Sequence, residues 1–303
     1  MEIKNSYWEQ ERACETKFLE GGPFFLLTTE DLPWLLFETE EDFKEGTNVI
    51  AISLAYLPIK LLVDVQMNNH LHLLFEGSQT DVTCFVTRLR KQILAFLHRK
   101  GRSLRSWNIQ IQPITDFRHF RNAILYVARN PYVAHRNATP LGYRWGSAHL
   151  LFNSNIADYS EGQPYVQLTY KAKRQLCHSH NIGLPDTYRV HGGMITRLSF
   201  VDYPRTQDFF ISANQFFQHL SRKKESDIET ARWIGESILL PNDDVFRIVS
   251  DWFGVKSITS LPLEKRMEAA RRMKAELSSN NKQIAQVLRF PQRQIDALFP
   301  VPQ

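Results

Sequence analysis

Hydrophobic and polar positions follow two different periods along the first half of the chain. Four short apolar runs have the length and residue types of β-strands, at 23–29, 59–66, 70–77 and 107–114. Between them, apolar residues recur three and four positions apart, which predicts helices over about 40–57, 82–100 and 117–130. We expect Asp81 to cap the second helix and Pro131 to end the third. This order predicts an α+β domain in which helices cover an antiparallel sheet.

The pattern changes after about residue 153. Residues 154–220 contain more Gly, Pro and Tyr and carry no motif, so we expect a connecting region of unknown role. From 221 to 303 the pattern is nearly all helical. We therefore expect three regions, 1–153, 154–220 and 221–303. No run approaches the roughly 18 apolar residues of a membrane helix, and the polar start of the chain is not a secretory signal.

Positive charge is concentrated in one stretch of the chain. Between Val82 and Ala157 there are twelve Lys and Arg residues and one acid, Asp116, although the net charge of the whole chain is only +5. A solvated basic face usually has acids among its bases, and here they are almost absent. The excess favours a polyanion partner, in particular a nucleic acid.

The most specific stretch is MNNHLHLLFEG, residues 67–77. Side chains two apart on a strand point the same way, so His70 and His72 project together while Leu71 faces the opposite side. Two neighbouring imidazoles are a good start for a divalent-metal site. Two histidines on a polar sheet face would fit the same pattern, and a metal also needs a third ligand from elsewhere.

The helix predicted at 117–130 could supply that ligand. Tyr126 and Asn130 are four residues apart and therefore share one helical face. If that face covers the histidine pair, the Asn130 oxygen is a third ligand and the Tyr126 hydroxyl is a nucleophile for phosphorus. A phenol is a weak nucleophile at neutral pH unless a base or a metal activates it. The alternative is that Tyr126 is a core aromatic and Asn130 caps the helix.

Together these motifs resemble the single-tyrosine HUH transposases, especially the REP-associated tyrosine transposases. The shared features are Met-x-Asn-His-Leu-His-Leu-Leu, the basic helix that follows, and the later Tyr-Val-x-x-Asn-Pro. The stretch Tyr143-Arg144-Trp145-Gly146-Ser147 is similar to the family's Tyr-x-Trp-Ser-Ser. The resemblance covers roughly residues 20–153. Asn68 stands where the family usually has proline, which changes the turn and not the ligands.

This resemblance implies a fold, a cofactor and a reaction. The fold is a ferredoxin-like antiparallel sheet with helices on one side, the HUH nuclease fold. Mg²⁺ or Mn²⁺ is held by His70, His72 and Asn130, and Tyr126 is the nucleophile. Single-stranded DNA is cut through a 5′-phosphotyrosine intermediate that leaves a free 3′-OH. The 3′-OH rejoins strands by the reverse attack, which is the chemistry of DNA transposition.

Basic and aromatic residues near the second helix are candidates for holding the DNA. Those expected to contact phosphates are Arg88, Arg90, Lys91, Arg99, Lys100, Arg102 and Arg105. Trp107, Tyr143 and Trp145 could stack on unpaired bases, a mode suited to a hairpin with single-stranded flanks, although core packing is the commoner fate of a tryptophan. We expect only some of the cations to reach DNA, since others are merely solvated.

The end of the chain has the spacing of a helix-turn-helix. Ile284, Ala285 and Leu288 share one helical face, and Pro291 opens a second short helix. Gln292 and Arg293 would then begin the recognition helix. Helical bundles produce the same spacing by chance, so packing or dimer contact is the alternative reading.

Three function classes remain open from the sequence. The first is a transposase of this family, with hairpin DNA and a second copy of the chain as partners. The second is a rolling-circle replication initiator or relaxase, which shares the histidine pair and the tyrosine. The third is a DNA-binding regulator with an idle site. Three widely spaced cysteines suit a reducing compartment such as the cytoplasm. The resemblance to transposases implies a bacterial protein associated with the nucleoid.

Overall fold

The computed structural model describes residues 2–29, 35–104, 107–134, 139–156, 162–221, 230, 242–277, 279 and 281–299. The chain divides into two compact units. The first comprises residues 1–131 with 138–222, and the second comprises residues 132–137 with 223–303. Each unit is described below by itself.

A four-stranded antiparallel sheet is the centre of the first unit. Its strands lie in the order β2-β3-β1-β4. The bounds are Phe24–Thr29 for β1, Lys60–Gln66 for β2, Leu71–Glu76 for β3 and Ile109–Ile114 for β4. Helix α2 (Glu40–Leu54) connects β1 to β2, and helix α3 (Gln79–Arg99) connects β3 to β4. All four strands predicted from the sequence are present, with ends within two residues of the prediction.

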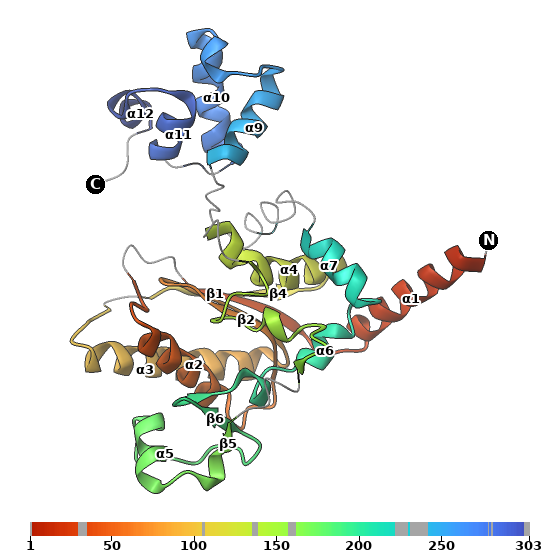
Figure 1. The fold of residues 1–303 in the computed structure, drawn as a ribbon, viewed down its shortest axis with the longest axis vertical. Helices are drawn as coiled ribbons and strands as arrows, with labels where there is room; N and C mark the ends of the chain where they lie inside the picture. Colours follow the sequence, from red (N-terminus) through yellow and green to blue (C-terminus); the bar gives the residue numbers. More distant parts are fainter. Residues whose placement is uncertain are drawn as a thin grey trace. The chain divides into compact units, whose positions relative to one another are not determined.

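Helices cover both faces of this sheet, which corrects the expectation of helices on one side. The Leu71, Leu73 and Phe75 face of β3 packs against α2 and α3 in one apolar core. The other face packs against α4 (Phe117–Ala134), where Phe120 lies 4.4 Å from Phe24 of β1 between ring centroids. Figure 1 shows α4 on the opposite side of the sheet from α2 and α3. A strand covered on both faces is apolar throughout, as β1 is, rather than alternating.

Helix α4 continues past Pro131 to Ala134, so the prediction that Pro131 ends it is wrong. Proline has a helical φ and removes only one hydrogen bond, so an otherwise stable helix can contain it. The Asp116 carboxylate accepts a hydrogen bond from the His119 N–H at 2.8 Å and so caps the start of α4.

The start of α3 also differs from the prediction. Ser78, not Asp81, is the N-cap, and its hydroxyl accepts a hydrogen bond from the Asp81 N–H at 3.1 Å. Asp81 lies in the first helical turn, where its carboxylate in turn accepts from the Ser78 hydroxyl. Just before this cap, Gly77 ends β3 with φ 155°, and a Cβ there would lie 2.5 Å from Ile59.

An N-terminal helix that the sequence did not predict, α1 (Glu2–Leu19), also belongs to the first unit. Its polar composition hides a short apolar contact near its end. Phe18 is buried there and stacks on Phe24 at 4.9 Å between ring centroids. The helix is therefore attached to the α4 face of the sheet through aromatic packing.

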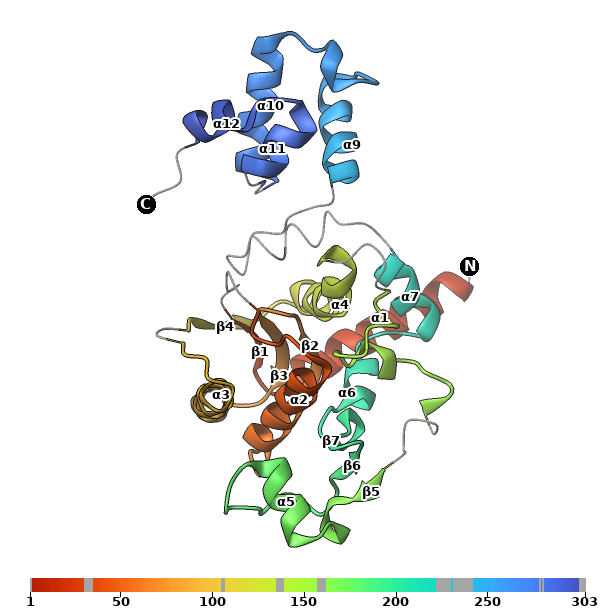
Figure 2. The same cartoon turned by 60° about the vertical axis from the view of Figure 1, so that its left-hand side comes forward.

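Residues 154–220 are part of the first unit rather than a separate connection. They form β5 (Gln163–Pro164), α5 (Tyr170–Cys177), β6 (Arg189–His191), β7 (Met194–Ile195), α6 (Tyr203–Gln207) and α7 (Ala213–Ser221). The Asn48 side chain of α2 bonds the backbone of Gly193 and Ile195, at 3.0 and 2.7 Å. The boundary between compact units therefore lies near 222 and not at 153 (Figure 2).

The second unit is helical, as the pattern after 221 predicts. Its helices are α9 (Asn242–Phe253), α10 (Leu263–Glu276), α11 (Asn281–Leu288) and α12 (Gln292–Leu298). The predicted apolar faces are buried, with Ile284 and Leu288 of α11 and Ile295 of α12 in the interior of the unit. Within the described parts of the chain, no helix is both long and apolar enough to cross a membrane.

Candidate active site

Strand β3 and the residue before it hold the histidine pair against α4. His72 lies between Leu71 and Leu73, which point into the α2–α3 core, so its ring faces α4. The His70 and His72 rings meet edge to face, with 4.7 Å between their centroids. The two imidazoles therefore lie side by side, as the strand period predicts.

Helix α4 brings Tyr126 and Asn130 onto this pair. The Tyr126 ring lies edge to face with the His72 ring at 5.3 Å between centroids. One turn later, the Asn130 amide nitrogen lies 2.9 Å from His72 Nε2. Spacing of four on a helix thus places both side chains over one strand residue. The structure brings these sequence-predicted groups into one cluster, which we call the His-Tyr-Asn cluster: His70, His72, Tyr126 and Asn130.

The turn before β3 fixes the cluster at the end of the sheet. Met67 N–H donates to the His70 carbonyl at 2.9 Å, which closes the turn, and Leu71 N–H donates to the Thr29 hydroxyl at 2.9 Å. Asn69 Oδ1 lies 3.0 Å from His70 Nδ1. His70 is half-buried, so its ring is the member of the pair nearer to solvent.

Burial decides the protonation of His72. The ring is fully buried, and this burial, with His70 beside it, holds the pKa of His72 well below its ordinary value. The ring is therefore neutral at neutral pH. In the present orientation of the Asn130 amide its nitrogen faces His72 Nε2, which corresponds to the tautomer that carries the ring proton on Nδ1. Nε2 thus presents its lone pair toward Asn130, which is the electronic state of a metal-ligating imidazole.

The donor set suits a divalent transition ion better than an ion that needs only oxygen. Within the described residues there is no group of three or more His, Cys, Asp and Glu side chains that could hold a metal. A third ligand would have to be the Asn130 amide oxygen, which requires the amide to turn over from its present orientation. Two imidazoles with one amide oxygen fit Mn²⁺ more closely than Mg²⁺, which prefers oxygen ligands.

Tyr126 is 2% exposed. A DNA phosphate can therefore reach its hydroxyl only if the chain around α4 moves. Asn130 is also buried, at 8% exposed, and His72 is completely buried. Three members of the cluster are thus closed off from solvent, and His70 is half-buried.

Most of the predicted phosphate contacts on α3 are bonded within the protein, on the opposite face of the sheet. Arg88 donates to the Ala55 carbonyl at 2.9 Å, and Arg90 donates to the Trp107 carbonyl at 3.2 Å. Lys91 is exposed. The described cations at the end of α3 form ion pairs with acids that lie in α2 or just before it. The pairs are Arg99–Glu45, Lys100–Asp42, Arg102–Asp42 and Arg102–Glu38.

The three predicted stacking residues have different surroundings. Trp107 is buried in the core with α3. Trp145 lies parallel to Phe43 of α2, at 4.9 Å between centroids and an interplanar angle of 16°. The Tyr143 hydroxyl donates to the Gln66 carbonyl at 2.8 Å, and burial raises the pKa of Tyr143 to about 12. Of the three, Tyr143 lines a cavity.

The other predicted contacts lie elsewhere. Arg105 and the side chain of Gln292 are outside the described residues. Arg293 is exposed in the first turn of α12. The DNA-reading role of α12 stays a prediction.

The sequence reasoning missed a buried ion pair on β2, on the α2–α3 face of the sheet. Asp64 of β2 is fully buried, and its carboxylate accepts from Arg197 Nε at 3.1 and 3.2 Å. An acid inside the apolar run IKLLVDVQ signals that a cation must lie opposite, because an unpaired buried charge is strongly unfavourable. The sequence does not say which of the many arginines that partner is.

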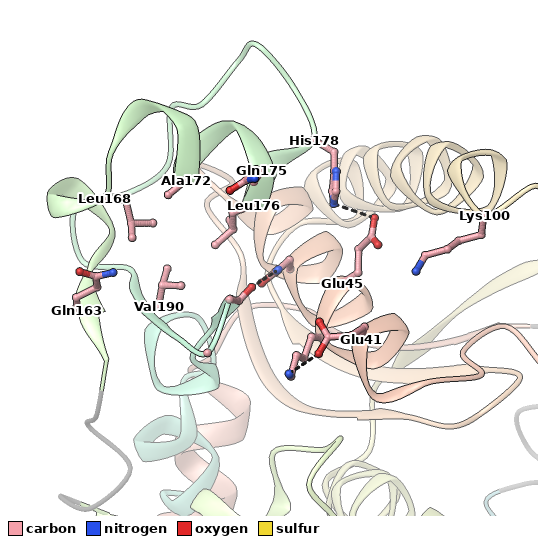
Figure 3. Close-up of a pocket in the computed structure, with 14 residues that line it drawn as sticks. Glu41, Glu45, Lys100, Gln163, Leu168, Ala172, Gln175, Leu176, His178 and Val190 are labelled. Atoms are coloured by element: carbon pink, nitrogen blue, oxygen red, sulfur yellow. Dashed lines mark hydrogen bonds and ion pairs between the residues drawn. The ribbon is translucent and has the colours of Figure 1, made fainter.

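Among the cavities of similar size in the described part of the first unit, two differ in the charge of their lining. One, of about 500 Å³, lies between α2 and α5 and is lined by acids as well as bases. Figure 3 shows His178 pointing to Glu45 there, at 3.1 Å, with Glu41 beside them. The other, of about 480 Å³, lies along β2 between residues 141–150 and 191–198 and has no acid in its lining.

No protein-family model and no curated protein matches the chain. Among solved structures, the chain is similar to one of the REP-associated tyrosine transposase bound to a REP hairpin. The two share 16% identity with a TM-score of 0.36, over 45% of this chain and 81% of that chain. A similarity of this size does not carry an activity from one protein to the other.

Proposed function

We propose that the protein is an HUH-type, metal-dependent DNA strand transferase that cleaves and rejoins single-stranded DNA through Tyr126. One observation carries the proposal: α4 places the Tyr126 ring 5.3 Å from the His72 ring and the Asn130 amide 2.9 Å from His72 Nε2. The strand order β2-β3-β1-β4 with its two connecting helices, the ferredoxin-like arrangement, supports the same assignment.

The proposed reaction exchanges one phosphodiester for another. The Tyr126 oxygen attacks phosphorus and the bond to the 3′-oxygen breaks, so the upstream fragment leaves with a 3′-OH and the downstream fragment stays on the tyrosine through its 5′-phosphate. The phenol loses a proton and the departing 3′-oxygen gains one, so no net proton or energy source is needed. The reverse attack by a 3′-OH rejoins strands. His70, His72 and Asn130 would hold Mn²⁺ or Mg²⁺, which when bound stabilises charge on the phosphate oxygens.

The residues of the cluster have separate tasks in this reaction. The β3 backbone and the closed turn before it orient the two imidazoles. Burial keeps His72 neutral and therefore able to ligate. Asn130 orients the His72 ring in the closed conformation. Opening of the chain around α4 is part of the cycle, because Tyr126 is buried.

A covalent adduct tests the proposal directly. The full chain is incubated with a labelled DNA hairpin that carries single-stranded flanks, in Mn²⁺, and separated under denaturing conditions. We expect a labelled protein band that mass spectrometry assigns to Tyr126, and its loss in Tyr126→Phe. The matched control is Tyr188→Phe, because Tyr188 is also buried and donates its hydroxyl to a backbone carbonyl. Adduct in Tyr126→Phe would overturn the proposal.

A second candidate function is a DNA-binding regulator in which the cluster is structural. The burial of Tyr126 at 2% exposed favours it. This function predicts tight hairpin binding with no adduct under any metal, and unchanged binding in Tyr126→Phe. The same gels with a native binding assay separate the two candidates. Cleavage of duplex plasmid at one site, without a hairpin requirement, would instead indicate a replication initiator or relaxase.

The helical unit is proposed to read DNA through α12. Its support is the helix, short turn and helix from Asn281 to Leu298, with Arg293 exposed at the start of α12. Bundle packing or contact with a second copy of the chain is the alternative. A transposase with these parts would act on the nucleoid of a bacterial cell.

A further inference from the structure

The cavity between residues 141–150 and 191–198 lies at the β2 edge of the sheet, where its Arg197 and Leu150 belong to the α2–α3 face and His72 belongs to the α4 face. Gly146 forms a β-bridge with Val65, and Val65 lies opposite His72 in the β2–β3 register. Neighbouring strands are about 4.8 Å apart, so the Gly146 backbone lies about 10 Å from that of His72. Tyr143, which lines the cavity, bonds the Gln66 carbonyl two residues closer to the turn that holds His70.

The lining of this cavity combines an apolar interior with cationic groups. Leu150 is buried and Leu198 is half-buried, and both line it together with the Tyr143 ring. Arg197 is the buried cation and Arg144 the exposed one. The cavity volume of about 480 Å³ lies within the range of small-ligand sites.

The two arginines differ in how firmly they are held. Arg197 is tied to the fully buried Asp64, so it is a fixed part of the wall. Arg144 pairs with Glu40 at 2.9 Å, but both side chains are more than half exposed. An exposed pair of this kind is weak and screened by solvent, so a phosphate can replace Glu40 as the partner of Arg144.

A histidine in the wall provides a neutral polar group. Burial lowers the pKa of His149 to about 4, with the Arg197 charge acting in the same direction. At neutral pH His149 is therefore a neutral polar part of the wall, and it bonds the backbone of Gly146.

We propose that this cavity binds one unpaired nucleotide of the DNA strand, with the base against Tyr143, Leu150 and Leu198 and the adjoining phosphate on Arg144. The proposal rests on the proposed function, which supplies the single-stranded DNA. Aromatic side chains stack on any base, and an apolar wall suits the faces of that base. The cavity between α2 and α5 does not fit this ligand, because Glu41 and Glu45 in its lining repel a phosphate (Figure 3).

The test measures binding without chemistry. All arms use the full chain carrying Tyr126→Phe, in EDTA, so that neither adduct nor metal contributes. The probes are a DNA hairpin with a short unpaired tail, the same hairpin without the tail, and tailed hairpins in which one tail position at a time is abasic. We expect one abasic position to weaken binding about tenfold.

Two substitutions link that position to the cavity. Leu198→Trp fills the cavity, and we expect it to weaken the tailed hairpin about tenfold and to abolish the effect of the abasic position. Arg144→Glu should weaken the tailed hairpin about tenfold and leave the tailless hairpin unchanged. The matched controls are Val166→Trp and Arg174→Glu, at exposed residues that do not line this cavity. We expect both controls to bind like the parent.

The remaining outcomes decide against either the cavity or the proposed function. An abasic scan with no sensitive position, or equal loss for tailed and tailless hairpins, overturns it. Displacement of the tail by a free deoxynucleoside monophosphate at micromolar concentration would assign the cavity to a free nucleotide instead of a strand. The unfolding midpoint of Leu198→Trp shows whether this variant is folded. If it is not, the surface variant Arg144→Glu still decides the test. An adduct at Tyr126 of the parent chain with a flat abasic scan refutes the cavity alone. A sensitive position without any adduct refutes the proposed function alone.

Discussion

The two faces of the central sheet use polar residues in opposite ways. On the α2–α3 face, the cations of α3 are many, and most of the described ones bond acids or carbonyls of the same unit. On the α4 face His70, His72, Tyr126 and Asn130 converge on one point. A high local density of positive charge in the sequence is therefore compatible with a structural role. The short His-x-His motif, in contrast, lies at the candidate active site.

The reason lies in what each face is paired with. The charge excess between residues 82 and 157 omits the acids that precede and begin α2, and the fold places these acids beside the end of α3. The ion pairs neutralise much of the excess. The His-Tyr-Asn cluster needs no ion pairs to neutralise it, because its members are uncharged groups held by a strand and a helix.

The strongest test of this comparison removes one imidazole from the α4 face. His70→Ala should lower the rate of adduct formation about a hundredfold at fixed Mn²⁺, because one of two ring ligands is lost. His70 is half-buried at the strand end, so the fold should survive. The rate is measured from labelled adduct against time, with EDTA removing the adduct and added Mn²⁺ restoring it.

The matched control for that test is His98→Ala, the same change at an exposed residue of α3. We expect it to form adduct at the parent rate. An equal loss in both variants, or no loss in either, would mean that the α4 face has no special role.

The next largest effect is one of stability on the α2–α3 face. Arg102 donates to the Leu35 carbonyl and pairs with Glu38 and with the buried Asp42. Arg102→Ala should lower the free energy of unfolding by about 1–3 kcal/mol, because the Asp42 carboxylate loses a partner. Urea unfolding measures this, and hairpin affinity should stay within about twofold.

The double variant makes the Arg102 prediction specific. In an Asp42→Asn background the cost of Arg102→Ala should shrink, since no buried charge is then left behind. A large loss of hairpin affinity without loss of stability would contradict the structural role and favour a phosphate contact.

Acid should destabilise the packing on both faces of the sheet by protonating one carboxylate on each, Asp42 on the α2–α3 face and Glu76 on the α4 face. Burial opposes ionisation of Asp42 and Glu76, but hydrogen bonds outweigh it, from Lys100 and the Glu38 N–H to Asp42 and from Arg205 and the Gly22 N–H to Glu76. The pKa of each folded carboxyl is therefore below its ordinary value. As pH falls, these two carboxyls take up protons in the unfolded chain before they do so in the folded chain. Their contribution to the free energy of unfolding is therefore complete above about pH 4.5 and is lost as pH falls through their folded-state pKa values.

Urea midpoints measured from about pH 6 down to about pH 3 test this window. We expect Asp42→Asn and Glu76→Gln each to be less stable than the parent at neutral pH and each to flatten the decline in acid. A parent-like slope in either variant would remove that carboxylate from the explanation.

The smallest expected effect is at Lys91, the exposed cation of α3. Lys91→Ala should change the affinity for single-stranded hairpin DNA by less than about twofold, because it lies on the face away from the cluster. A true phosphate contact would lower the dependence of log affinity on log salt by about one. A lower salt dependence in Lys91→Ala would show that α3 contacts DNA and would contradict the structural role given to the cations of the α2–α3 face.

Local patterns predicted the central sheet of the first unit, its helices α2, α3 and α4, and the pairing inside the site, but not α1 or the elements within residues 154–220. All four strands of the sheet and helices α2, α3 and α4 follow from apolar periodicity, since a strand or helix that is covered by a core must repeat its apolar residues. The ends were less predictable. Ser78 rather than Asp81 caps α3, because both residues suit the position and only the hydrogen bonds distinguish them. Helix α1 was missed because it contacts the sheet mainly near one end.

The amino-acid sequence by itself determined that His70 and His72 share a side and that Tyr126 and Asn130 share a side, because both statements follow from the repeat of one local element. Only the tertiary structure decided that α4 crosses the His72 face of β3, that Tyr126 is closed off from solvent, and that α2 neutralises α3. Only the tertiary structure, likewise, joins residues 141–150 to 191–198 around a cavity. Those facts depend on contacts between residues far apart in the chain, and no local period encodes which distant partner a side chain meets.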